Sequence, residues 1–150
     1  MGKKRELISD KKYDYKVVYF EACRFLEIAE EYNEKYGNLG FSNGYLVPIL
    51  VNVSFSCELF LKSILRLENN MREVHDLKKM FDNISSEASK TIREKINDDN
   101  FDKLIEKTKL YFNYWRYAYE KTFYGDVELG FMFKLAEALK STIDERAQIK

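Results

Sequence analysis

Apolar residues recur along most of the chain at alternating steps of three and four, which places them on one face of an α-helix. The first such pattern follows Ser9, a predicted N-cap, and ends near Tyr36, where Gly37 is expected to stop the helix. The glycines and asparagines of residues 37–44 then indicate a loop. The residues predicted to face inward in this first helix are Val18, Ala22, Phe25, Ala29, Tyr32 and Tyr36.

A second helix is predicted to begin near Tyr45, with Pro48 in its first turn, and to end at Asn69 and Asn70. It is apolar over two adjacent stripes, which is typical of a helix in the middle of a bundle. The face that is left is polar and carries small residues, so that another backbone could approach it closely. This face consists of Asn52, Ser56, Ser63 and Arg66.

The next segments predict two short helices and one long one. The short helices cover residues 75–83 and 86–97, and Ser85 is a good cap for the second of them. The polar residues 97–100 then break the chain, and a long fourth helix is predicted over residues 101–124. Its inward stripe is predicted to be Phe101, Ile105, Thr108, Phe112, Trp115, Tyr119 and Thr122.

Gly125 and Asp126 are predicted to end the fourth helix and to cap a fifth. No repeat or linker divides the chain, so residues 1–150 are predicted to form a single domain. The fold class is therefore all-α: an up-and-down bundle of four to five helices, with one or two short helices between the second and fourth long ones. In the fifth helix the residues predicted to face inward are Leu129, Met132, Ala136, Leu139 and Ile143.

Composition and charge exclude several classes of protein. Among 150 residues, 25 basic side chains balance 25 acidic ones, so no broadly basic surface for nucleic acid is expected, although a local basic patch stays open. The N-terminal residues lack the apolar core of a secretory signal, and polar residues interrupt the longest apolar run, so no membrane span is expected. Cys23 and Cys57 lie in apolar helical patterns and are expected to be reduced core thiols of a cytoplasmic protein.

The stretch SCELFLKSIL places Glu58 on an apolar stripe of the second helix. An unpaired buried carboxylate is costly, and Lys62, one turn on, offers only about 0.2–0.5 kcal/mol as a helical pair. Arg116 in the fourth helix is a better partner, because a guanidinium can bind a carboxylate through two hydrogen bonds. We therefore predict that Glu58 is charged, buried and paired with Arg116, with Lys62 reaching the same cluster. We favour a bridge that fixes helix register; the alternative is an active-site carboxylate.

His75 is the only histidine, so any general-base or metal site would have to include it. No metal-ligand spacing surrounds it, so neither a metal nor a cofactor is expected, and a structural role beside the predicted cap Asp76 is favoured. In the aromatic run of the fourth helix, Tyr114 and Tyr117 fall off the inward stripe. They could stack on nucleobases or be buried in a two-fold dimer interface, and we favour the interface.

Three stretches, VSFSCELFLKSIL, HDLKKMF and YWRYAYE, together resemble the HEPN superfamily of prokaryotic helical domains. The resemblance implies a helical bundle that dimerises. Many such domains are metal-independent ribonucleases of toxin–antitoxin, abortive-infection or CRISPR-associated systems, whereas others partner a nucleotidyltransferase or bind nucleotides. The residues in the matching motifs are Glu58, Lys62, His75, Asp76 and Arg116 to Glu120.

The chain departs from the nuclease members, which carry Arg-x4-6-His late in the bundle: no histidine follows Arg116. We therefore expect a dimeric module of a stress or defence system that binds a nucleotide, RNA or a partner chain (a nucleotidyltransferase or an antitoxin) without cleavage. The alternatives are a divergent metal-independent endoribonuclease that uses His75, Arg116 and Glu120, and a purely structural dimer. The expected binding residues are Glu58, Lys62, Asp76, Arg116 and Tyr117.

Overall fold

The computed structural model describes residues 14–38, 44–71, 73–118 and 127–147. Within these ranges the chain forms helices and no strand, which confirms the prediction of an all-α fold. The helices are α2 (Tyr15–Tyr36), α3 (Leu46–Leu67), α4 (Leu77–Asn83), α5 (Ser86–Ile96), α6 (Phe101–Thr108), α7 (Tyr111–Trp115) and α8 (Leu129–Ala147).

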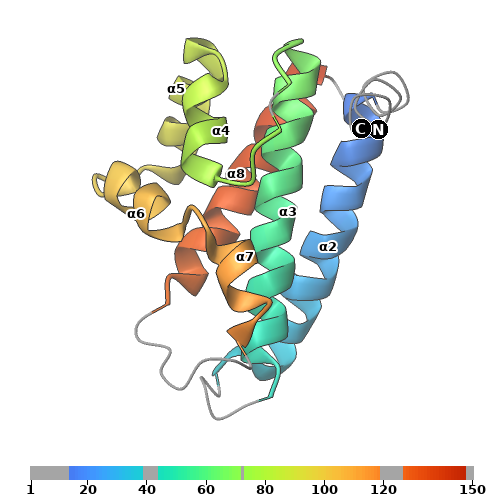
Figure 1. Cartoon of the computed structure of the whole chain (residues 1–150), viewed down its shortest axis with the longest axis vertical. Coiled ribbons are helices and arrows are strands. Elements are labelled where there is room, and N and C mark those ends of the chain that lie inside the picture. The colour runs from blue at the N-terminus through green and yellow to red at the C-terminus, as the bar shows by residue number, and fades with distance from the viewer. Residues whose placement is uncertain (1–13, 39–43, 72, 119–126, 148–150) are drawn as a thin grey trace.

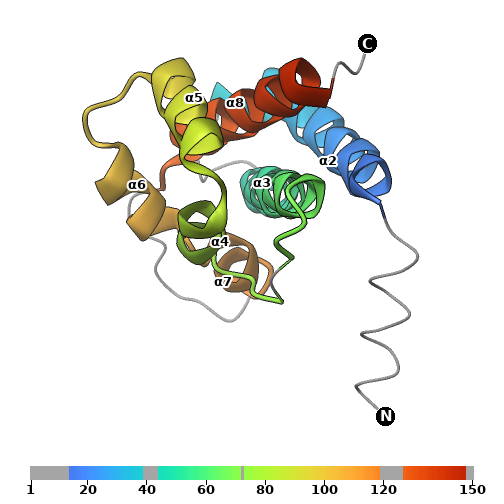
Figure 2. The same ribbon diagram turned by 90° about the horizontal axis from the view of Figure 1, so that it is seen from above.

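The long helices α2, α3 and α8 run alongside one another, and chain direction alternates from α2 to α3, to the α6–α7 segment and to α8 (Figure 1). Seen from above, α3 occupies the middle, with α2 and α8 on one side and α4 and α7 on the other (Figure 2). Helix α5 packs on α8, and α6 packs on α4. The described helices thus surround α3 and share one hydrophobic core.

Helix α3 is the core helix that its two apolar stripes predict. It is the one described helix long and apolar enough to cross a membrane. However, 61% of its most apolar 18-residue stretch is buried inside the bundle, as is usual for the core helix of a helical bundle. On its polar face, Ser56 Oγ donates to the carbonyl of Ala22 at 2.9 Å, and Ser63 Oγ donates to the carbonyl of Tyr15 at 2.8 Å. The predicted close approach of another backbone is confirmed, and that backbone belongs to α2.

The two ends of α2 compare differently with the prediction. The side chain of Asp14 caps the helix by accepting hydrogen bonds from the backbone N–H groups of Lys16 and Val17, and the predicted cap Ser9 lies outside the described residues. At the other end the prediction is confirmed, since α2 ends at Tyr36 and Gly37 is its C-cap; the φ of Gly37 is −61°, so this end does not use the left-handed glycine that is common there.

The inward face of α2 is also rotated relative to the predicted one, because this helix packs on α3 and α8 together. Tyr19 and Leu26 are buried with the predicted Ala22 and Ala29, whereas Val18 and Phe25 are only half-buried. Phe25 instead packs edge to face on Phe55, with ring centroids 4.8 Å apart, near the surface between α2 and α3. Tyr32 and Tyr36 lie outside the core, where they stack on Tyr45.

The two short helices begin where their caps predict. An Asp76 carboxylate oxygen accepts from the N–H of Lys79 at 3.0 Å, and Ser85 Oγ accepts from the N–H of Ala88 at 3.1 Å. Both bonds satisfy a backbone donor that a helix start otherwise leaves unpaired. In α8 the predicted inward stripe is buried except for Leu129, which is half-buried.

The predicted long fourth helix is wrong: α6 ends at Thr108, a turn follows, and α7 covers only Tyr111–Trp115. The hydroxyl of Thr108 bonds back to the carbonyl of Leu104 at 2.9 Å, and the carbonyl of Lys109 accepts from the N–H of Leu77 at 3.0 Å. Such competing bonds bend or end a helix. The predicted stripe residues Tyr119 and Thr122, and the predicted terminators Gly125 and Asp126, lie outside the described residues.

Candidate functional site

The centre of the candidate site is Glu58, whose side chain on α3 is only 1% exposed, so its predicted burial is confirmed. Its Oε2 atom lies 3.1 Å from Lys62 Nζ and 3.0 Å from Nδ1 of His75. The predicted contact with Lys62 is therefore present. Lys62 lies one turn beyond Glu58 on α3, and its side chain is 21% exposed. We call Glu58, Lys62 and His75 the carboxylate cluster.

His75 lies in the segment that leads into α4, directly before the cap Asp76. Its side chain is 62% exposed although Nδ1 contacts the buried Glu58. A carboxylate can only accept, so Nδ1 carries the proton and donates it to Glu58. The other ring nitrogen, Nε2, makes no hydrogen bond within the described residues. A buried carboxylate thus orients an imidazole whose second nitrogen is left for chemistry or for a ligand.

Arg116 does not take part in this cluster, so the predicted Glu58–Arg116 pair is wrong. Its guanidinium carbon lies 5.0 Å from the ring centre of Phe112 and 4.9 Å from that of Tyr117. The turn after α6 changes the helical phase, so that Trp115 fills the seam beneath α7 while Arg116 is exposed. Arg116 is therefore held by two aromatic rings instead of by a carboxylate.

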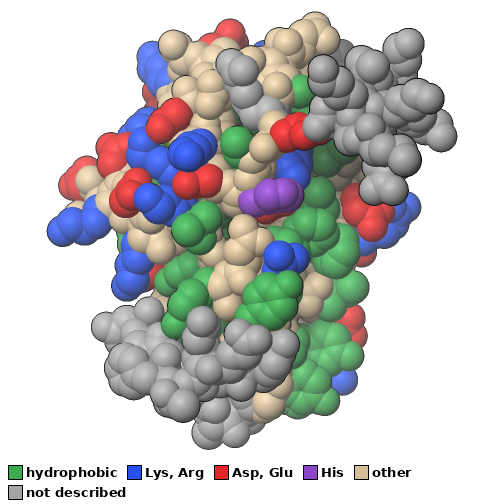
Figure 3. Space-filling view, in the orientation of Figure 1, with side chains coloured by type: hydrophobic (Ala, Val, Ile, Leu, Met, Phe, Trp, Pro, Cys, Tyr) green, Lys and Arg blue, Asp and Glu red, His purple; other side chains and the backbone are tan. Residues whose placement is uncertain are grey.

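Phe112, one of these two rings, connects Arg116 to the neighbourhood of the carboxylate cluster. Phe55 lies three residues before Glu58 on α3, a rise of about 4.5 Å along the helix. Its ring stacks on that of Phe112, with centroids 4.4 Å apart. We call Phe55, Phe112, Arg116 and Tyr117 the aromatic ledge. Figure 3 shows the histidine at the surface of this face, with apolar surface and both basic and acidic side chains around it.

The burial of Glu58 is incompletely compensated. Its second oxygen, Oε1, is buried and accepts no hydrogen bond from the described residues. Leaving a buried acceptor without a partner costs about 1–3 kcal/mol, and more for a charged group. A carboxylate kept only to fix helix register is expected to be satisfied on both oxygens. This uncompensated cost favours a functional role of Glu58 over the role in fixing helix register that the sequence pattern favours.

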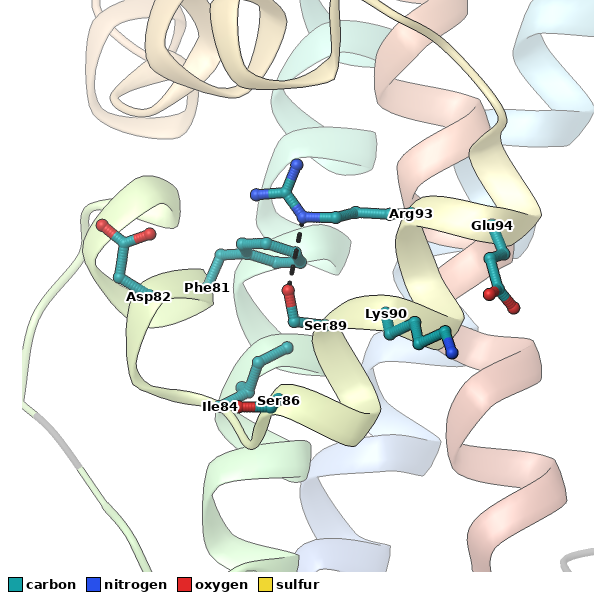
Figure 4. A pocket seen from close by; sticks show the side chains of 8 residues that line it. All are labelled: Phe81, Asp82, Ile84, Ser86, Ser89, Lys90, Arg93 and Glu94. Atoms are coloured by element: carbon teal, nitrogen blue, oxygen red, sulfur yellow. Dashed lines mark hydrogen bonds between the residues drawn. The ribbon is translucent and has the colours of Figure 1, made fainter.

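A different cluster lies beside a cavity of about 420 Å³ between α4 and α5 (Figure 4). Here Arg93 donates to both carboxylate oxygens of Asp102, at 3.1 and 2.8 Å. Its guanidinium carbon also lies 5.3 and 4.7 Å from the ring centres of Phe81 and Phe101. The hydrogen bonds from Arg93 lower the pKa of Asp102 below its usual range. Both carboxylate oxygens of Asp102 and both terminal nitrogens of Arg93 thus have a partner, as in a structural cluster.

The remaining predicted site residues divide into two groups. Asp76 caps α4 and thereby fixes the backbone next to His75, whereas Glu120 lies outside the described residues. Within the described ranges, no three His, Cys, Asp or Glu side chains are grouped closely enough to hold a metal ion. The contact that sequence reasoning missed is the one between Glu58 and His75. The only signals for this contact in the sequence were that Glu58 lies on an apolar stripe and that His75 is the one histidine of the chain.

The fold and the site define a class: an all-α bundle with an exposed histidine oriented by a buried carboxylate. Comparisons of this chain with protein-family models, with curated proteins and with solved structures found no significant match. The function is therefore argued from the site itself.

Proposed function

We propose that this chain is a HEPN-like module that binds a phosphate-bearing ligand, RNA or a nucleotide, at the carboxylate cluster. The observation that carries this proposal is the shared contact of Lys62 and His75 with Oε2 of the buried Glu58. The carboxylate holds an ammonium and an imidazole side by side at one surface. Both groups can donate to phosphate oxygens, and their positions are set before the ligand arrives.

The local charge supports the same proposal. The chain has no net charge, so attraction for a polyanion must come from a patch. Arg116 adds a cation to the face of His75, and within the described residues no carboxylate pairs with it. An arginine held by aromatic rings keeps its five donors for phosphate or base.

The resemblance to HEPN domains extends the proposal to assembly and setting. We propose a cytoplasmic homodimer in a prokaryotic stress or defence system, with a nucleotidyltransferase or an antitoxin as a partner chain. Tyr114 is 41% exposed, as expected of an aromatic residue that a second copy would cover. Light scattering at tens of micromolar tests the assembly: a dimer mass is expected, and a monomer mass contradicts it.

Cleavage of RNA is a second candidate, favoured by the contact between Glu58 and His75. In this reaction Nε2 of His75 takes the proton of a ribose 2′-hydroxyl, and the 2′-oxygen attacks the adjacent phosphorus. The bond to the 5′-oxygen breaks, that oxygen takes a proton from solvent, and a 2′,3′-cyclic phosphate remains. Glu58 stabilises the imidazolium, while Lys62 and Arg116 stabilise the charge on the phosphate.

The test of binding uses fluorescence anisotropy with a labelled single-stranded RNA, and thermal shift with ATP and GMP. His75→Ala and Lys62→Met are expected to weaken RNA binding about tenfold or more. Lys90→Ala, which removes an exposed lysine beside the α4–α5 cavity, serves as the matched control and is expected to change it less than about twofold. Equal losses in all three variants, or no binding by the native chain, would contradict the proposal.

Incubation of the same RNA with native protein and with His75→Ala separates the two candidates. Product that carries a 2′,3′-cyclic phosphate and disappears in His75→Ala supports cleavage. Intact RNA that is nevertheless bound supports a module that binds without cutting.

A further inference from the structure

We infer that the aromatic ledge is a stacking platform for one nucleobase of the ligand whose phosphate lies at the carboxylate cluster. This inference rests on the proposed function and adds the part of the ligand that gives recognition beyond charge. It assigns Tyr117 to the base and leaves Tyr114 to the dimer interface. The ligand class is then a nucleotide or an unpaired RNA strand, and a phosphate compound without a base would bind less tightly.

The ledge has the geometry of a stacking site. Phe55 and Phe112 are stacked with an interplanar angle of 22°, and the guanidinium of Arg116 lies over both Phe112 and Tyr117. Unpaired bases stack on aromatic side chains and on arginine guanidinium planes. The Arg116 side chain is fixed by two rings, so little conformational entropy is left to lose when a base arrives.

The outer residues of the ledge are exposed to solvent, where a base could reach them. Tyr117 is 44% exposed and Arg116 is exposed as well, whereas Phe55 and Phe112 are half-buried and form its base. No carboxylate among the described residues occupies Arg116, so its charge is available to an anionic ligand. This differs from Arg93, which also lies over two rings but is bound at both nitrogens by Asp102.

The ledge also lies close to the carboxylate cluster, which is proposed to bind phosphate. Phe55 is one helical turn from Glu58 on α3, and Glu58 holds Lys62 and His75. The base of the ledge at Phe55 is therefore about 4.5 Å along the helix axis from the carboxylate that positions Lys62 and His75. Around the histidine, Figure 3 shows apolar surface next to basic side chains, with acidic side chains nearby as well.

The test compares three probes on the full chain: a fluorescein-labelled uridine hexamer of RNA, an abasic hexamer with the same number of phosphates, and inorganic tripolyphosphate as a competitor. Native protein is expected to bind the uridine hexamer at least about fivefold more tightly than the abasic one. Tripolyphosphate is expected to displace both, since it competes for the carboxylate cluster alone.

Variants locate the effect. Tyr117→Leu is expected to weaken the uridine hexamer about fivefold or more and to leave the abasic hexamer unchanged, while Tyr117→Phe, which keeps the ring, restores native binding. Phe20→Leu is the matched control, because Phe20 is a similarly exposed aromatic residue (46%) on α2, and it is expected to change neither affinity. Arg116→Lys keeps the charge and loses the planar group, so discrimination between the hexamers falls while the salt dependence stays.

The outcomes separate the two levels of the proposal. If the hexamers bind native protein equally, or if Tyr117→Leu weakens both alike, the stacking inference is overturned and the phosphate site stands. The same holds if Phe20→Leu has the effect of Tyr117→Leu. If neither a hexamer nor tripolyphosphate binds, the proposed function itself fails. Thermal unfolding of each variant confirms that it is folded, which the surface position of Tyr117 leads us to expect.

Discussion

Two clusters of charged and aromatic side chains in this bundle differ in how completely their charged groups are paired. Around Arg93, the charged groups are paired: the guanidinium binds both oxygens of Asp102 and lies over two rings, at a partly exposed surface. Around Glu58, the carboxylate is buried in the core helix, one oxygen serves both Lys62 and His75, and the other has no partner among the described residues.

The difference shows which cluster is kept for stability. The Arg93 cluster can stabilise the packing of α5 on α6 at little cost, because its charges are both paired and partly solvated. With Glu58 at this buried position, the protein is less stable than it would be with an apolar residue there. Proteins tolerate such costs mainly at functional sites. The contrast therefore supports the proposal that Glu58 and His75 act in function, whereas Arg93 stabilises the fold.

The largest effects are expected for Glu58→Leu. The affinity for RNA should fall about tenfold or more, because Lys62 and His75 lose the group that holds them. The free energy of unfolding should stay the same or rise by about 1–4 kcal/mol, since an apolar side chain replaces a partly unsatisfied carboxylate and both former partners reach solvent. Urea unfolding and anisotropy measure the two quantities.

A matched control for Glu58→Leu is Ser54→Ala, one turn earlier on the same buried face, where the serine hydroxyl also has no partner among the described residues. It should leave the affinity for RNA unchanged. A drop of several kcal/mol in the stability of Glu58→Leu with unchanged binding would reverse the contrast between the two clusters and make Glu58 structural.

Removing the two arginines should give opposite patterns. Arg93→Ala is expected to lower the free energy of unfolding by about 1–2 kcal/mol, because it loses a two-point ion pair and contacts with two rings. Arg116→Ala should cost less than about 1 kcal/mol of stability and should weaken RNA binding, whereas Arg93→Ala should leave binding unchanged. If both variants lose stability equally and neither loses binding, Arg116 is structural as well.

Double-mutant cycles test which residue Glu58 contacts. The cycle of Glu58→Gln with His75→Gln should give a coupling energy of about 0.5–1.5 kcal/mol, the usual range for a hydrogen bond that is partly exposed. The cycle of Glu58→Gln with Arg116→Gln should give a coupling energy near zero. Denaturant unfolding of the single and double variants provides both values, and the reverse ranking would mean that Arg116 replaces His75 in solution.

The smallest effect belongs to a carboxyl pair that is part of neither cluster. Burial, then a hydrogen bond with the Glu137 carboxyl and its charge, raise the pKa of Glu30 from 4.5 to about 7, although Lys140 opposes the shift. The folded state therefore binds this proton more tightly than the unfolded state, and its contribution to stability is lost as the pH rises from about 4.5 to about 7.

Glu30→Gln removes this dependence. The variant should match the native chain near pH 4 and should be more stable by about 1 kcal/mol at pH 8, a value reduced for the solvent exposure of Glu30. Urea unfolding at the two pH values measures it. A native chain whose stability rises relative to the variant between these pH values would contradict the sign, and any change in RNA affinity would show that this pair is not independent of the site.

The parts of the fold that were predictable from the sequence follow from local periodicity. The stripes of α3, the caps Asp76 and Ser85 and the serines that face α2 each depend on residues close in the chain. The break between α6 and α7 was not predictable, because it involves a hydrogen bond from Leu77, distant in sequence.

The candidate site was predictable only in part, for the same reason. The burial of Glu58 and its contact with Lys62 follow from spacing on one helix. Its contact with His75 joins residues 17 positions apart across a connection between helices, whose path is set by the packing of α4 on α3. The guanidinium of Arg116 suited the Glu58 carboxylate chemically, but the phase of α7 places it over Phe112 and Tyr117 instead.

The orientation of His75 is the central claim, and a single measurement tests it. Because the chain has one histidine, a long-range proton–nitrogen NMR spectrum of imidazole-labelled protein contains one set of ring signals. At a pH where the ring is neutral, the proton is expected on Nδ1, which donates to Glu58, and not on Nε2, where it predominates in free histidine. Glu58→Leu should restore the pattern of free histidine. A native spectrum that already shows the proton on Nε2 would contradict the contact on which the proposed site depends.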